Sequence, residues 1–157
     1  MAVVTALYFI VPFKWRRYLL LAASFIFYMK WSVSLVWLIV YVVFLNYVAA
    51  LGIARMENKT PRRILLIVSI VGSLVPLFTF KYLDFFIRSV AWFLDNESVH
   101  TYNLILPIGI SFYTFQAMSY TIDVYRGTIN VERSLLDVTL YIMFFPQLVA
   151  GPIMRAS

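Results

Sequence analysis

Long apolar runs separated by short charged runs make up the pattern of this chain. Residues 33–54 carry no charge. A helix rises ~1.5 Å per residue, so this run extends about 33 Å and can cross the ~30 Å hydrocarbon core of a bilayer. Further apolar runs cover residues 1–13, 18–29, 64–80 and 104–122. The pattern predicts an all-α, polytopic transmembrane helix bundle with about five membrane segments.

Two of these runs are shorter than a full span. Residues 1–13 would reach only about 20 Å as a helix, so we interpret them as the last part of a first membrane helix whose beginning is missing. Residues 18–29 fit either a tilted span or a re-entrant helix. We therefore expect residues 1–157 to be a single, incomplete membrane domain, the N-terminal part of a longer fold.

The segment 81–94 differs from the spans. Lys81, Asp84 and Arg88 recur there at helical spacing among aromatic side chains. This pattern is typical of an amphipathic helix that lies in the membrane interface. We expect Pro76 to kink the preceding span.

Small and polar residues inside the apolar runs predict contacts between helices. We expect Asn46 to form an interhelical hydrogen bond, and Ser69 and Ser73, with Gly72, to allow close approach of two helices. Helix ends are also marked: Gly127 fits the position after a helix C-terminus. A capping-box variant at 134–137 predicts a last helix over roughly residues 135–145.

Composition agrees with a membrane protein. Hydrophobic residues make up 63% of the chain and charged residues 13%, against about 45–50% and about 25% in soluble domains. This excludes a soluble globular domain and intrinsic disorder. The net charge is +6, but the basic residues stand in short runs between apolar stretches. Such runs face anionic lipid headgroups, so the lipid bilayer is the expected partner and nucleic acid is not.

The distribution of charge suggests a topology. Basic segments at 14–17 and 55–63 are expected on the cytoplasmic side, and the acidic segment 95–103 on the outside. This assignment assumes that residues 18–29 cross the membrane and that 81–94 do not.

The strongest candidate for chemistry is the segment 107–127. On a helical wheel, Tyr113, Gln116, Tyr120 and Asp123 share one face. Polar groups are costly at membrane depth, so this face should meet protein or a water-filled cavity. It either lines a buried polar tunnel or joins helices, with Asp123 bonded to Arg126. The residues alone do not favour one alternative.

A second candidate lies at 144–155. Pro146 frees backbone carbonyls, and Gln147 offers donors and acceptors. A broken helix there could line a cavity or simply end in a loop. Arg155 is either an anion or headgroup contact or a flanking charge.

Other catalytic chemistry has little support. The chain has no cysteine and a single histidine, His100, in a polar segment without apolar shielding. We interpret His100 as a solvated loop residue, and we expect no bound cofactor and no metal site.

Two stretches resemble a known family. LPIGISFYTFQAMSYTIDVYRG (106–127) and LLDVTLYIMFFPQLVAGPIMR (135–155) are similar to the membrane-bound O-acyltransferases, and within them to the bacterial branch that acetylates alginate. Residues 8–31 and 80–86 also resemble the N-terminal region of that family. The likeness therefore covers nearly the whole chain.

This resemblance implies a multi-pass protein of the inner (cytoplasmic) membrane, roughly three times longer than this chain. Family members transfer an acyl group, here expected to be acetyl, from a thioester or carrier to hydroxyls of an exopolysaccharide such as alginate. The catalytic histidine of the family lies in a later segment, and His100 does not match its motif. We therefore expect no catalytic residue here and an inactive isolated chain. The resemblance makes these residues candidates for shaping the tunnel or core: Tyr113, Gln116, Tyr120, Asp123, Arg126, Gln147 and Arg155.

Two further functions remain open from the residues. The chain could be a non-catalytic scaffold subunit that joins other proteins of a polysaccharide acylation complex. A small transporter or channel would need paired half-helices or a ring of ionisable groups, and Asp123 alone is weak support for it.

Overall fold

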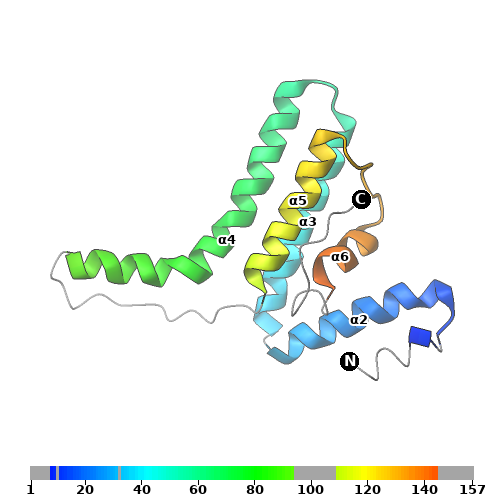
Figure 1. The fold of residues 1–157 in the computed structure, drawn as a ribbon, viewed down its shortest axis with the longest axis horizontal. Helices are drawn as coiled ribbons and strands as arrows, with labels where there is room; N and C mark the ends of the chain where they lie inside the picture. The colour runs from blue at the N-terminus through cyan, green and yellow to red at the C-terminus, as the bar shows by residue number, and fades with distance from the viewer. Residues whose placement is uncertain (1–7, 10, 32, 94–108, 145–157) are drawn as a thin grey trace.

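The apolar runs fold into helices, as the computed structural model shows for residues 8–9, 11–31, 33–93 and 109–144 (Figure 1). The helices of this described part that we name are α2 (Phe13–Trp31), α3 (Val33–Arg55), α4 (Lys59–Phe93), α5 (Ile110–Arg126) and α6 (Leu135–Met143). No strand occurs among these residues. The predicted all-α fold is confirmed.

Three helices form the centre of the molecule. α3, α4 and α5 pack against one another, and Figure 1 shows α5 running beside α3 and the first part of α4. α2 packs on α3 and α6 and lies across the lower end of this bundle in Figure 1, opposite the connection between α3 and α4. The core is formed where α3, α5 and α6 meet, around Ile39, Val42, Tyr113, Ile142 and Met143.

Two of the described helices are long and apolar enough to cross a membrane: Val36–Arg55 in α3 and Lys59–Val90 in α4. The predicted number of five membrane segments is not confirmed. The run 18–29 lies within α2, which crosses the end of the bundle instead of running beside α3 (Figure 1). Residues 1–7 of the first predicted segment lie outside the described part of the chain.

The predicted separation of 64–80 from the following segment is wrong, because residues 64–93 belong to one helix, α4, of 35 residues, and residue 94 lies outside the described part of the chain. Pro76 lies inside this helix. Figure 1 shows that the first part of α4 runs beside α3 and α5, whereas its second part turns away from them. A proline ring clashes with the preceding turn and lacks an N–H, which bends a helix without always ending it.

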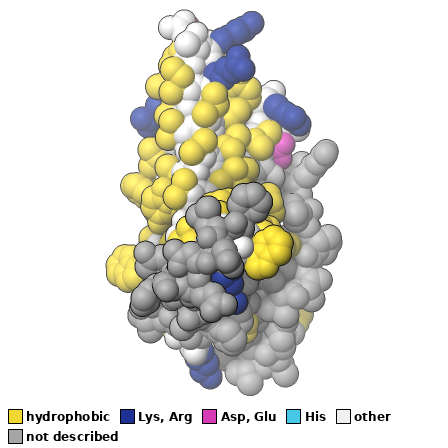
Figure 2. Space-filling model, turned by 90° about the vertical axis from the view of Figure 1, so that its left-hand side faces the viewer, with side chains coloured by type: hydrophobic (Ala, Val, Ile, Leu, Met, Phe, Trp, Pro, Cys, Tyr) yellow, Lys and Arg dark blue, Asp and Glu magenta, His cyan; other side chains and the backbone are white. Residues whose placement is uncertain are grey.

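The first part of α4 presents an apolar outer face. Exposed side chains include Ile64, Ile67, Val68, Val71 and Val75. Figure 2 shows hydrophobic side chains over this side of the molecule, with Lys and Arg side chains at its upper end. This order of charges above an apolar surface is that of a membrane helix entering the hydrocarbon from the headgroup region.

The small residues of α4 lie against α3, as predicted. Ser69 and Ser73 are fully buried. A Cβ atom added at Gly72 would lie 2.6 Å from Cδ2 of Leu45, and one at Gly52 would lie 2.7 Å from Cδ1 of Leu65. The absence of a side chain at these two positions therefore lets α3 and α4 approach closely.

One buried polar network joins the three central helices. Asn46 Nδ2 donates to Ser73 Oγ at 2.8 Å and to the Val42 carbonyl at 2.9 Å. Thr121 Oγ1 of α5 donates to Asn46 Oδ1 at 2.8 Å. The predicted interhelical role of Asn46 is confirmed, since its carboxamide connects α3 to both α4 and α5.

The segment between α5 and α6 begins and ends as its sequence indicated. Gly127 has φ 73°, and the N–H groups of Gly127 and Thr128 donate to the carbonyls of Val124 and Asp123, which completes a Schellman motif. Ser134 Oγ accepts from the Asp137 N–H at 3.3 Å and caps α6. α6 ends at Met143, two residues before the predicted boundary.

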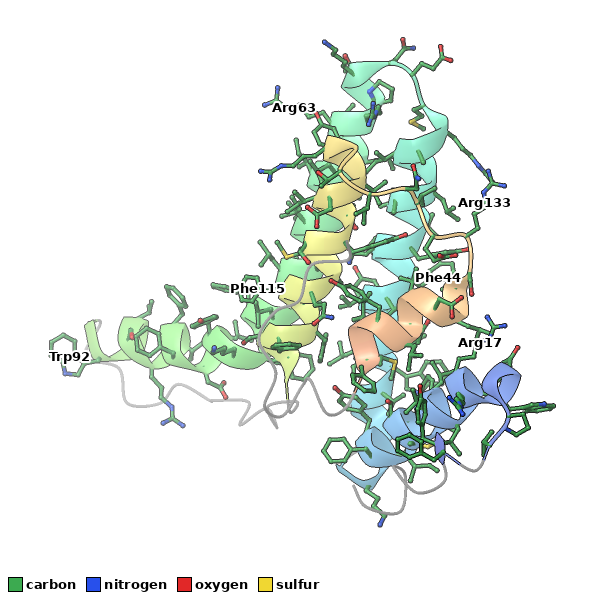
Figure 3. All side chains as sticks on the ribbon, turned by 45° about the vertical axis from the view of Figure 1, so that its right-hand side comes forward. Arg17, Phe44, Arg63, Trp92, Phe115 and Arg133 are labelled. Atoms are coloured by element: carbon green, nitrogen blue, oxygen red, sulfur yellow. The ribbon has the colours of Figure 1, made fainter. Side chains whose placement is uncertain are left out.

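The expected placement of the two basic segments on one side is not supported. Figure 3 shows Arg17 on α2, away from Arg63 at the upper end of α4. Arg17 forms a 3.6 Å ion pair with Asp137 of α6. Arg17 lies there because of this contact and because α2 lies across the bundle. The predicted topology had assumed instead that residues 18–29 cross the membrane.

Candidate functional site

The polar face of α5 points into the protein. Tyr113 and Gln116 are fully buried, and Tyr120 is 3% exposed. Their spacing of three and four residues places them on one side of the helix. This side meets protein, as we expected for polar groups that cannot face lipid.

Gln116 joins this face to α6. Its Nε2 donates to the Tyr141 carbonyl at 2.8 Å. The Tyr141 side chain also forms hydrogen bonds with Ser119 and Gln116. Burial raises the pKa of the Tyr141 phenol, and these hydrogen bonds oppose the shift only in part, so the group stays neutral near pH 7. The contact of Gln116 and Ser119 with Tyr141 therefore consists of neutral hydrogen-bonding groups.

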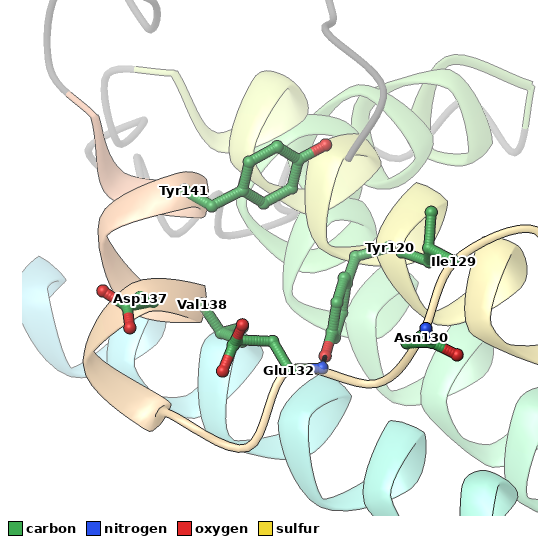
Figure 4. A pocket seen from close by; sticks show the side chains of 7 residues that line it. All are labelled: Tyr120, Ile129, Asn130, Glu132, Asp137, Val138 and Tyr141. Atoms are coloured by element: carbon green, nitrogen blue, oxygen red, sulfur yellow. Dashed lines mark hydrogen bonds between the residues drawn. The ribbon is translucent and has the colours of Figure 1, made fainter. Parts of the chain in front are cut away.

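Tyr120 borders a pocket between α5 and α6. The Glu132 N–H donates to the Tyr120 hydroxyl oxygen at 3.1 Å, and the rings of Tyr120 and Tyr141 lie 6.5 Å apart. The pocket has a volume of about 230 Å³. Figure 4 shows the side chains that line it: Tyr120, Ile129, Asn130, Glu132, Asp137, Val138 and Tyr141. It is large enough for a small polar molecule, and its wall combines aromatic rings with carboxylates and an amide.

Of the remaining predicted residues, Asp123 lies near enough to Tyr141 for its charge to act on that phenol, whereas Arg126 is exposed. Asp123 is half-buried, and within the described helices no ion pair joins it to Arg126. The expected bond between Asp123 and Arg126 is therefore not found, although the face does join α5 to α6 through Gln116. Gln147 and Arg155 lie outside the described residues.

Sequence reasoning missed several residues of the site. Tyr141 contacts Gln116, and Glu132 contacts Tyr120. Both contacts form only because the chain turns back between α5 and α6. Tyr28 of α2 is buried at 6% exposure and belongs to the same core cluster as Tyr113. The one available signal was a tyrosine inside most of the apolar runs, which is too common to single out.

The buried polar face can form hydrogen bonds to oxygen and nitrogen groups, and its described side chains include no evident nucleophile. Across residues 8–9, 11–31, 33–93 and 109–144, no three His, Asp or Glu side chains come close enough to hold a metal ion. The buried tyrosine, glutamine and threonine side chains can orient a hydroxyl or a carbonyl by hydrogen bonds. The face is therefore suited to positioning and enclosing groups.

Comparison with known proteins identifies the relatives of this chain. It is 37% identical over 154 residues to a probable alginate O-acetylase of Azotobacter vinelandii, covering 95% of this chain and 31% of that protein. A probable alginate O-acetylase of Pseudomonas aeruginosa is also 37% identical, over 95% of this chain and 29% of its own length. A peptidoglycan O-acetyltransferase of Helicobacter pylori is 33% identical over 88% of this chain and 31% of its own length.

The chain is similar to one part of the alginate O-acetylases. It spans about a third of the length of the alginate O-acetylases it matches. The resemblance predicted from residues 106–127 and 135–155 is thereby confirmed. No protein-family model matches the chain, and no solved structure does.

Proposed function

We propose that this chain forms part of a membrane-bound O-acyltransferase that transfers acetyl groups to hydroxyls of an exopolysaccharide such as alginate. The observation that carries the proposal is its similarity to alginate O-acetylases over 95% of its length. A peptidoglycan O-acetyltransferase among the relatives supports the same reaction class, acetyl transfer to polymer hydroxyls. The acyl donor would be an acetyl thioester or an acylated carrier.

In this proposal the chain supplies the walls of the site. The buried face of Tyr113, Gln116 and Tyr120 offers neutral donors and acceptors that can orient a hydroxyl or a carbonyl without reacting with it. The catalytic base would come from the part of the protein that the chain does not span. The isolated chain would then have no activity.

The reaction needs a base and a dry environment. A histidine outside this chain would take the proton of the acceptor hydroxyl while that oxygen attacks the thioester carbonyl, and the thiol would leave. Packing of α3, α5 and α6 around the polar face supports the exclusion of water, which would otherwise hydrolyse the donor.

The membrane location is part of the proposal. α3 and α4 would cross the inner membrane in a multi-pass protein. The second part of α4 carries Lys81, Asp84 and Arg88 with exposed Phe85 and Trp92 and would lie in the interface. Other proteins of an acetylation complex would be further partners.

An acetyl-transfer assay tests this function. Membranes that lack their own acyltransferase would contain either this 157-residue chain or the chain extended through its native downstream reading frame. Acetylation of the polymer by the extended form alone supports the proposal. Activity of the short chain would contradict the architectural role, and His100 would then be the first residue to substitute.

A second candidate function is a non-catalytic scaffold subunit of an acylation complex. The finding that favours it is the absence of an evident nucleophile in the described polar face, which consists of hydrogen-bonding groups. Acetylation restored only when other proteins of the complex are supplied, with the chain itself unextended, would support the scaffold.

A further inference from the structure

Two tyrosine hydroxyls lie in the core without a hydrogen-bond partner among the described residues. Tyr28 comes from α2 and is 6% exposed, and Tyr113 comes from α5 and is fully buried. Within the described part of the chain neither hydroxyl oxygen has a partner, although each phenol can donate one hydrogen bond and accept others.

Their surroundings make this arrangement unfavourable. Both rings belong to the core cluster that contains Ile39, Ile110 and Met143. A hydroxyl that leaves water for an apolar environment without gaining a partner destabilises the folded state. Such groups are rare in native interiors, and a trapped polar ligand or water is the usual explanation.

The two hydroxyls are also neighbours and are closed off from solvent. Both lie in one core cluster, where burial raises the pKa of the Tyr28 phenol and the nearby Tyr113 phenol adds to the rise. Each oxygen exposes almost no surface. A partner must therefore be small and enclosed between the helices, because a large group could not reach these atoms without displacing the core.

We propose that Tyr28 and Tyr113 together hold one enclosed oxygen ligand, with both hydroxyls bonded to the same oxygen atom. The ligand would join α2 to α5, whereas α2 otherwise packs mainly on α3 and α6. It would also extend the polar face of α5 by a residue from another helix.

Two sources supply this chemistry. One is a trapped water molecule, which needs no enzymatic activity. The other is a hydroxyl or carbonyl oxygen of a substrate, and this form rests on the proposed acyl transfer. The test separates the two sources. A bound water contributes to the stability of the substrate-free protein, whereas a substrate oxygen contributes only to substrate binding during turnover.

The test uses the chain extended through its native reading frame, purified in detergent. Tyr28→Phe, Tyr113→Phe and the double variant are compared by thermal unfolding without substrate and by KM and kcat for acetyl transfer. Tyr82→Phe is the matched control, because its ring is 40% exposed on the second part of α4. Phenylalanine keeps the ring, so these variants should fold.

A trapped water predicts that each single variant lowers Tm by a few degrees. The double variant should lower Tm by less than the sum, since both hydroxyls hold one oxygen. A substrate oxygen predicts an unchanged or raised Tm with a several-fold rise in KM that is again less than additive in the double variant. In both cases Tyr82→Phe behaves like the unsubstituted protein.

A different pattern would overturn the proposal. If each single variant leaves Tm unchanged or raises it, and KM also stays unchanged, the two hydroxyls bind no ligand. Fully additive losses in the double variant would show two separate sites. If the extended protein has no acetyl-transfer activity, the proposed function fails, and Tm alone decides: a non-additive loss supports the water, and no loss overturns the site.

Discussion

The Tyr41 hydroxyl of α3 donates a hydrogen bond of 3.4 Å to the Gly72 carbonyl of α4. In a regular helix this carbonyl would accept from the N–H four residues later, which is position 76. Pro76 occupies that position and has no N–H. The Tyr41 hydroxyl therefore takes the place of the N–H that Pro76 lacks, at the point where α4 passes through the proline as one helix.

Replacing Tyr41 by Phe should destabilise the protein by about 1 kcal/mol, because the Gly72 carbonyl loses this donor. Thermal unfolding of the full-length protein in detergent measures the loss. With Pro76→Ala, the helix regains its own N–H, so Tyr41→Phe should then cost less. An equal cost in both backgrounds would show that the two groups are independent.

The link between Asn46 and Thr121 should be necessary for packing of the three central helices. Asn46→Ala leaves the hydroxyls of Ser73 and Thr121 without this partner and should cost about 1–3 kcal/mol. Val48→Ala, at a 47% exposed position of the same helix, is the control and should cost much less. Chemical denaturation in mild detergent compares the two, and equal losses would contradict the role of the network.

Close approach of α3 and α4 should not tolerate a side chain at position 72. Gly72→Val should destabilise by about 1–3 kcal/mol, because its Cβ would lie 2.6 Å from Leu45 Cδ2. Shortening the neighbour in Gly72→Val/Leu45→Ala should recover part of the loss, as read by Tm. Failure of the second substitution to recover any stability would place the strain elsewhere.

Gly127 provides a test of backbone conformation without packing. A Cβ at this position would meet nothing within 4 Å, but φ is +73°. Gly127→Ala should therefore cost about 1 kcal/mol from the left-handed conformation alone. Asn adopts this conformation more readily, so Gly127→Asn should cost less. If Ala and Asn cost the same in thermal unfolding, conformational preference does not explain the glycine.

The local pattern of the chain was enough to predict features that depend on neighbouring residues. Uncharged runs predicted helices, and Ser134 and Gly127 marked the ends of α6 and α5 correctly. Burial of Asn46, Ser69 and Ser73 was predicted as well. The physical reason is that capping, helix periodicity and the cost of polar groups in apolar surroundings act over a few residues.

Other features were decided only when the helices packed. Residues 64–93 form a single helix that passes through Pro76, and Tyr41, 31 residues from Gly72, donates to the carbonyl that lacks a helical N–H partner there. α2 lies across the bundle because it packs on α3 and α6, although its apolar run alone could have formed a span. The packing of α2, α5 and α6 into one core gives Gln116 its partner on α6. The same packing leaves the hydroxyls of Tyr28 and Tyr113 without a partner among the described residues. Such contacts join residues far apart in the chain, and helical periodicity shows which face is polar without showing what that face meets.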